Sequence, residues 1–158
     1  MVADYSLRRA CRQIRLGVLE KEKCMKEITL EADIKNIPVV TEFVDGILEE
    51  HDCSMKAQIQ IDVAIDELFS NIARYAYAPG TGMATVKVEA DNTPAVNITF
   101  IDKGIPYNPL AKEDPDVTLS AEEREIGGLG IFMVKKSMDD MFYEYKDGSN
   151  ILTIRKNI

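Results

Sequence analysis

Residues 61–77 read IDVAIDELFSNIARYAY. We expect the rest of the chain to pack around this stretch, which therefore decides the fold. Its apolar side chains recur every three or four residues, which predicts a helix with one buried face: Ile61, Ala64, Ile65, Leu68, Ile72 and Tyr75. Glu67 and Asn71 are four residues apart, so their side chains lie one above the other beside that face. Such a pair suits a divalent cation and the activation of a hydroxyl, although most pairs of this kind are simply solvated.

The composition indicates one soluble globular domain. The chain has 158 residues, of which 46% are hydrophobic and 29% are charged. Its formal charge of −8 argues against a nucleic-acid binder. Three cysteines without metal-site spacing (Cys11, Cys24 and Cys53) indicate reduced thiols in a cytoplasmic protein. No apolar run approaches the roughly 20 residues that span a bilayer, so stable membrane insertion is not expected.

Residues 1–25 form a basic extension that differs from the domain expected at residues 26–158. Four apolar side chains at helical spacing, Leu7, Cys11, Ile14 and Val18, are accompanied by four arginines, Arg8, Arg9, Arg12 and Arg15. A basic amphipathic helix can lie on a membrane surface or dock on a partner. We favour a short helix folded back on its own domain, or a poorly ordered extension.

The remaining pattern predicts an α+β fold. In order, it indicates a strand (27–32), a helix with Asn36 as N-cap and Pro38 in its first turn (to about 51), a helix capped by Ser54, two hairpin strands (83–90 and 95–101), a long loop (103–125), a helix (126–138) and a last hairpin (141–145 and 151–155). His51, the only histidine, is expected at the surface. The whole is interpreted as a two-layer α/β sandwich, with a mostly antiparallel sheet and helices on one face.

Residues 100–105 read FIDKGI, an apolar strand that runs into an Asp-x-Gly turn. The carboxylate of Asp102 at the end of this strand is costly unless it accepts from a donor. Gly104 has no side chain, so a flat ring could approach its backbone closely. The alternative is a turn aspartate that caps its own backbone.

Residues 126–134 read IGGLGIFMV, a glycine turn that opens a helix. The free amides and positive helix end at Gly128, Leu129 and Gly130 suit a phosphate group. A lone Gly-x-Gly is a weak signal, but this one follows a long loop, and such loops are usually functional or mobile.

Glu-x-x-x-Asn, Asp-x-Gly and Gly-Leu-Gly, in this order, resemble the motifs of the Bergerat-type ATPase superfamily, which includes gyrase, MutL, histidine kinases and anti-sigma-factor serine kinases. The resemblance covers about residues 25–158 and is greatest to the last group. Gyrase and MutL need further domains, and residues 1–25 contain no histidine for the helical hairpin of a sensor kinase. The family's glycine box often reads Gly-x-Gly-x-Gly. Here Ile126 replaces the first glycine and Gly127 is extra.

The resemblance implies ATP or ADP and Mg²⁺ as ligands, and it assigns roles to residues of this chain. Glu67 corresponds to the general base, Asn71 to the metal ligand, and Asp102 to the acceptor of the adenine amine. The remaining ATP-binding candidates are Arg74, Gly104, Gly128, Leu129, Gly130, Arg124 and Thr153. Asn150 lies with Thr153 in the hairpin that approaches adenine in the family.

The function implied is an ATP-binding anti-sigma regulatory factor with serine/threonine protein kinase activity. It would phosphorylate an anti-anti-sigma antagonist, sequester a sigma factor by turns, and form a homodimer, as family members commonly do. A second hypothesis is a nucleotide-gated protein-binding module that transfers no phosphate. A third is an α/β domain without a ligand, in which three ordered motifs coincide by chance.

Overall fold

The computed structural model describes residues 24–90, 93–116, 118 and 128–158. Along the chain its elements are β1 (Cys24–Glu31), the 3₁₀ turn η1 (Ile34–Asn36), α1 (Ile37–Glu50), α2 (Met55–Asn71), the π-helical segment η2 (Ile72–Ala76), β2 (Met83–Ala90), β3 (Ala95–Asp102), α3 (Leu129–Ser137), β4 (Asp140–Lys146) and β5 (Ser149–Asn157).

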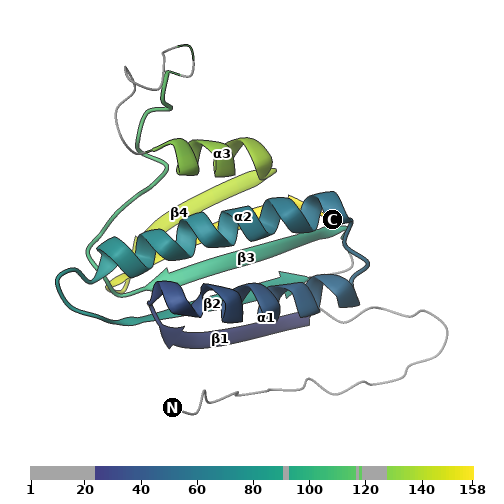
Figure 1. Ribbon diagram of the computed structural model, residues 1–158, viewed down its shortest axis with the longest axis horizontal. Helices are drawn as coiled ribbons and strands as arrows, with labels where there is room; N and C mark the ends of the chain where they lie inside the picture. Colours follow the sequence, from purple (N-terminus) through teal and green to yellow (C-terminus); the bar gives the residue numbers. More distant parts are fainter. Residues whose placement is uncertain (1–23, 91–92, 117, 119–127) are drawn as a thin grey trace.

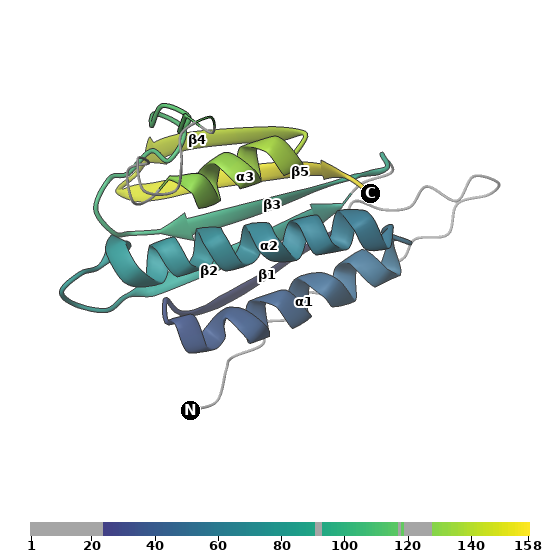
Figure 2. The same cartoon turned by 45° about the horizontal axis from the view of Figure 1, so that its top comes forward.

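The strands form one five-stranded sheet in the order β1-β2-β3-β5-β4, with all four pairings antiparallel. The three helices cover one face of this sheet (Figures 1 and 2). The predicted two-layer α+β sandwich is therefore confirmed. In the part of the chain described above, no helix is long and apolar enough to cross a bilayer.

The core lies between the helices and the sheet. Because side chains alternate along a strand, one face of β2 and β3 supplies the buried residues Val86, Val88, Ile98 and Phe100. On α2 the predicted stripe is buried through Leu68. The prediction for Tyr75 is wrong, since its side chain is 62% exposed. The helix widens to a π-helix after Asn71, so α-helical spacing no longer holds at Tyr75.

The helix starts differ in how they are capped. The Ser54 hydroxyl accepts from the amide of Ala57 at 3.3 Å, which confirms the predicted cap of α2. Asn36 occupies the N-cap position of α1 but makes no side-chain capping bond. Its carboxamide instead donates to the carbonyl of Glu31 at 2.8 Å, so it ties the start of α1 to the end of β1. His51 is the C-cap of α1 and is half-buried rather than fully at the surface.

Two carboxyl groups meet where α1 packs on α2. One side-chain oxygen of Asp45 and one of Asp62 are buried, and neither has a hydrogen-bond partner among the described residues. Burial, the nearby charge of Asp45 and a hydrogen bond to it raise the pKa of Asp62 to about 6. A proton held between the two groups relieves their repulsion. Burial of Cys53 and the nearby charges of Asp45 and Asp62 raise the pKa of the Cys53 thiol.

Asp62→Asn should gain stability relative to wild type as pH rises. Because folding raises the pKa of Asp62 from 3.8 to about 6, its stabilising contribution is fully present below pH 3.8 and is lost as pH rises through 6. The difference in unfolding free energy between variant and wild type should grow by about 1 kcal/mol from pH 4 to pH 8, a value reduced for solvent screening. Urea unfolding at both pH values measures it.

The control is Asp66→Asn, four residues further along α2 with an exposed side chain. Its difference from wild type should change little between the two pH values. An equal pH response of both variants would show that Asp62 does not hold its proton through the contact with Asp45.

Candidate functional site

Glu67 and Asn71 lie one turn apart at the end of α2, as predicted. The Asn71 side-chain nitrogen Nδ2 donates to Glu67 Oε1 at 3.0 Å. Both residues are half-buried. The bond orients the carboxamide so that its oxygen remains an acceptor, and Oε2 of Glu67 remains one as well. The pair therefore keeps one side-chain oxygen on each residue available as a ligand.

The start of α3 lies directly against Glu67. A Cβ atom built on Gly130 would overlap the carboxylate group of Glu67, so a larger residue would displace this carboxylate. Gly128 precedes the helix with a φ of +90°, in the left-handed region that favours glycine. The first helical bond runs from the amide of Phe132 to the carbonyl of Gly128 at 3.0 Å. The amides of Leu129 and Gly130 thus lack helical acceptors and suit an anion.

Asp102 ends β3 and is buried, with 6% of its surface exposed. Its Oδ1 atom accepts from the backbone amide of Gly104 and from the side chain of Asn150, both at 2.9 Å. The first bond is the one expected of a turn aspartate. Among the described residues no hydrogen bond is made to Oδ2, so this oxygen is the one left for a ligand donor.

Asn150 holds the carboxylate of Asp102 in place. Its Nδ2 atom donates to Asp102 and to the carbonyl of Ile105, at 2.9 Å each. Its Oδ1 atom accepts from the amide of Tyr107 at 3.0 Å and from the hydroxyl of Tyr143 at 2.7 Å. Burial raises the pKa of the Tyr143 phenol, which keeps it a donor. Four hydrogen bonds satisfy the whole carboxamide and join β3, β4, β5 and the loop after β3.

Gly104 is needed for packing, a reason that the sequence did not indicate, and the approach of a ring to its backbone stays a prediction. A Cβ atom built there would overlap the carbonyl group of Ala76. The adjacent amide of Ile105 donates to the oxygen of that carbonyl at 2.9 Å. This contact fixes η2 against the end of β3, close to Asp102.

Two other candidates, Thr153 and Arg74, form no hydrogen bond or ion pair with this group among the described residues. Thr153 lies on the uncovered face of the sheet, where its hydroxyl is 2.9 Å from that of Thr99. Strand side chains alternate, so Asn150 and Thr153, three positions apart on β5, point to opposite faces. Arg74 is exposed within η2. Arg124 lies outside the described residues.

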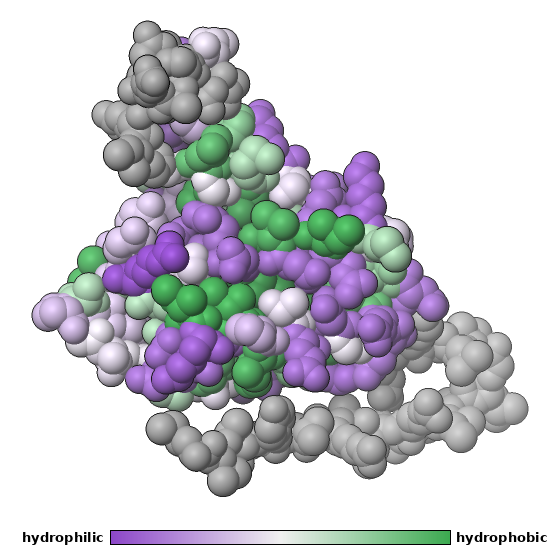
Figure 3. Space-filling view, in the orientation of Figure 1, coloured by the Kyte–Doolittle hydropathy of each residue, from purple (hydrophilic) through white to green (hydrophobic). Residues whose placement is uncertain are grey.

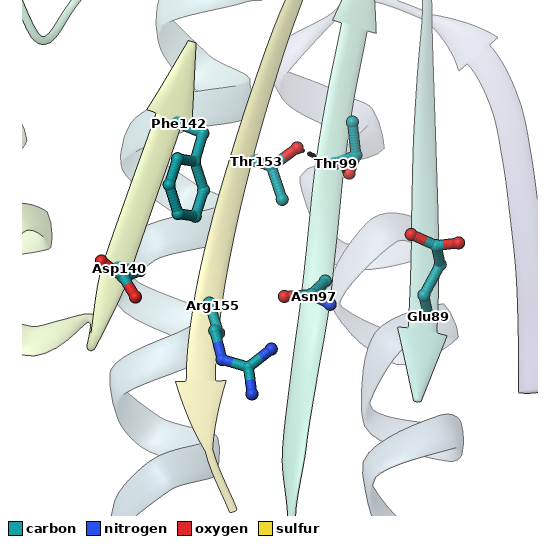
Figure 4. Close-up of a pocket in the computed structure, with 7 residues that line it drawn as sticks. All are labelled: Glu89, Asn97, Thr99, Asp140, Phe142, Thr153 and Arg155. Atoms are coloured by element: carbon teal, nitrogen blue, oxygen red, sulfur yellow. Dashed lines mark hydrogen bonds between the residues drawn. The ribbon is translucent and has the colours of Figure 1, made fainter. Parts of the chain in front are cut away.

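The uncovered face carries a hollow of its own, which is separate from the candidate site (Figure 4). Its lining is polar except for one ring and comes from four strands: Glu89, Asn97, Thr99, Asp140, Phe142, Thr153 and Arg155. Thr153 is the one predicted site residue in this lining, so we do not carry it into the site.

Lys112 is a residue near the site whose importance the sequence did not indicate. Its Nζ atom would be 3.3 Å from a Cβ built on Gly128, at the start of α3. The side chain of Lys135 on α3 donates to the carbonyl of Lys112 at 3.2 Å and pairs with Asp114 at 3.0 Å. The contacts of Lys135 attach the described part of the long loop to α3, and the amine of Lys112 lies beside the helix start. The only sequence signal that could have identified Lys112 as a site residue is that basic residues are scarce in this acidic loop.

Residues 30–156 match the family model described as the histidine kinase-like ATPase domain. The chain belongs to this family. It is 26% identical over 101 residues to the serine/threonine-protein kinase BtrW of Bordetella bronchiseptica, covering 64% of this chain and 71% of that protein. The predicted resemblance to the superfamily is therefore confirmed.

The crystal structure of the RsbU and RsbW domains of Rv1364c from Mycobacterium tuberculosis is similar in fold. Its TM-score is 0.60 at 18% identity, over 85% of this chain. The chain covers 32% of the length of that protein. Because the sequence identity is also low, this likeness concerns the fold alone.

Membership of an ATPase family implies that the chain binds nucleotide, and the oxygen donors at Glu67 and Asn71 fit a magnesium ion. Among the described residues no group of three or more His, Cys, Asp or Glu could hold a metal ion. Mg²⁺ does not need such a group, because it commonly takes one or two protein oxygens together with phosphate oxygens and waters. The free oxygen of Asn71, fixed by its bond to Glu67, meets that requirement.

Gly104→Ala should destabilise the protein by about 2 kcal/mol, because its new methyl group would meet the backbone of Ala76, which cannot rotate away as a side chain would. Gly46→Ala is the matched control. Gly46 lies within α1 with no atom within 4 Å of a Cβ built on it, and alanine there should add about 1 kcal/mol through helix propensity. Chemical denaturation of the two variants measures both effects. Equal stability of the two would show that the contact between η2 and the end of β3 is not tight in solution.

Proposed function

We propose that this protein is an ATP-dependent serine/threonine protein kinase of the anti-sigma type. The observation that carries the proposal is the contact of Gly130 with Glu67, because it brings the carboxylate bonded by Asn71 next to the amides at the start of α3 that lack helical acceptors. BtrW carries the name of a serine/threonine-protein kinase, which supports the same class of reaction.

The adenine end of the nucleotide would bind at Asp102. The second carboxylate oxygen of Asp102, which has no protein donor among the described residues, suits the exocyclic amine of adenine as its hydrogen-bond donor. Asn150 keeps the carboxylate in position but has no donor left to spend on a ligand. It would therefore act on adenine through Asp102.

The phosphate end would lie at the start of α3. The amides of Leu129 and Gly130, the positive helix end and the amine of Lys112 would neutralise the phosphate charge. Asn71 would hold Mg²⁺, which supplies further charge neutralisation when bound. Arg74 and Arg124 remain candidates for further phosphate contacts.

Glu67 would act as the general base. As the hydroxyl oxygen of a substrate serine bonds to the γ-phosphorus, the bond between that phosphorus and the bridging oxygen breaks and ADP leaves. The hydroxyl proton passes to the carboxylate of Glu67. The protein substrate would be an anti-anti-sigma antagonist and the alternate partner a sigma factor or a similar switch protein, with the kinase acting as a homodimer.

A nucleotide-gated binding module without phosphotransfer is the second candidate. It is favoured by the acidic residues near Lys112 in the loop, Glu113, Asp114 and Asp116, because negative charge near phosphates hinders transfer unless the loop moves away. Both candidates require the same nucleotide site and differ in what Glu67 does there.

Asn71→Ala should weaken magnesium-dependent nucleotide binding at least tenfold, because it removes the metal ligand and frees Glu67. For wild type we expect micromolar affinity, about −8 kcal/mol. Calorimetric titration of ADP and ATP, with and without Mg²⁺, measures this. Asn97→Ala removes the same side chain on the uncovered face of the sheet and should bind as wild type does. Absence of binding by wild type would rule out the nucleotide site.

Glu67→Gln should retain nucleotide binding and lose phosphotransfer to the protein substrate by at least a hundredfold, because a carboxamide is no base. Transfer of labelled phosphate from ATP to a serine of the antagonist measures this, with Asp66→Asn as the neighbouring control. Undiminished transfer by Glu67→Gln would exclude Glu67 as the base. If wild type binds nucleotide but transfers none, the binding module is the correct function.

A further inference from the structure

The outward side of α2 carries an exposed apolar ridge. Met55, Ile59 and Val63 are four residues apart and are 78%, 57% and 54% exposed. Their spacing stacks them over two turns of the helix, on the side away from the core. Figure 3 shows apolar side chains gathered on this side of α2 among hydrophilic ones. Single exposed apolar residues are ordinary, but an aligned row of large ones indicates an interaction surface.

Carboxylates flank this ridge on the side of α1. Glu42, Asp45 and Glu49 share one face of α1 by their spacing. Asp45 meets Asp62 of α2, so this face lines the seam between the two helices. Asp62 and Asp66 add two more carboxylates from α2. None of the five forms an ion pair with a described lysine or arginine.

The surface therefore fits a helix with an apolar stripe and basic flanks. We propose that residues 1–23 of this chain dock on it as an amphipathic helix. Their stripe of Leu7, Cys11, Ile14 and Val18 would pack on the ridge of α2. Arg8, Arg9, Arg12 and Arg15 would lie beside the carboxylates of the seam. Residues 1–23 contain six basic and three acidic side chains, so the net positive charge of the segment complements the negative charge of the domain.

The segment has the length that this docking requires. β1, which begins at Cys24, starts at the end of the molecule where α2 also starts (Figure 1). Residues 19–23 can span about 17 Å when extended. A helix over residues 7–18 is about 18 Å long, and the ridge from Met55 to Val63 is about 12 Å long. The docked helix would cover the ridge without reaching Glu67, so this proposal is independent of the kinase reaction.

Disulfide trapping in the full chain tests the docking. Ile59→Cys is combined with Cys24→Ser and Cys53→Ser, which leaves Cys11 and the introduced thiol. Cys11 is at the middle of the stripe and Ile59 at the middle of the ridge, so they meet whichever way the helix runs. Glu144→Cys, on the uncovered face of the sheet, replaces Ile59→Cys in the control. Under mild oxidation at low protein concentration, the Ile59→Cys chain should form its internal disulfide at least ten times faster.

Changing Arg8, Arg9, Arg12 and Arg15 to Glu should lower that rate to the control level. Thermal melting confirms that each variant folds. If the serine variants do not fold, peptide mapping of disulfides in the chain that keeps Cys24 and Cys53 gives the same comparison. Equal rates for the two introduced thiols, or no effect of the arginine changes, would overturn the proposal. Disulfides mainly between two chains would overturn it in favour of a second copy as the occupant.

Discussion

The contact between the start of α3 and the carboxylate of Glu67 is the constraint on which the candidate site depends. A residue larger than glycine at position 130 would displace the carboxylate to which Asn71 is bonded. In the structure, the negative charge of Glu67 lies at the positive end of α3, which is a favourable place for it. An incoming phosphate would bring a second anion to the same helix end. The site therefore calls for added positive charge, which Lys112 and the cation proposed on Asn71 would supply.

The other end of the site has a different character. Asp102 and Asn150 are directly paired across β3 and β5, so the register of the sheet itself sets their contact. Two of the four hydrogen bonds of Asn150, with Ile105 and Tyr107, then hold the loop after β3 against the sheet, and the other two join β3 and β4. This end is a rigid acceptor that exists before any ligand arrives. The α3 end depends on a loop and a helix start, so we expect the adjustments on binding to concentrate there.

Much of the fold and part of the site followed from local rules. The three-four spacing of Ile61, Ala64, Ile65 and Leu68 predicted the central helix, and the same periodicity placed Glu67 above Asn71. Thr153 could have been set aside from the sequence, because alternation along a strand sends it and Asn150 to opposite faces. Lys112 could not have been found in this way, since its position depends on the path of an irregular loop.

The π-helical segment after Asn71 shows why local rules stop at the site. Continued α-helical spacing would have buried Tyr75 and placed Arg74 above Asn71, whereas in the structure Tyr75 is exposed and the wider turn changes the position of Arg74. The same turn puts the carbonyl of Ala76 against Gly104 and Ile105, contacts made with residues far along the chain. It thereby connects the end of the helix that carries Glu67 and Asn71 to the end of the strand that carries Asp102. The departure from regular helix is thus what joins the two halves of the site, and only the folded chain can show it.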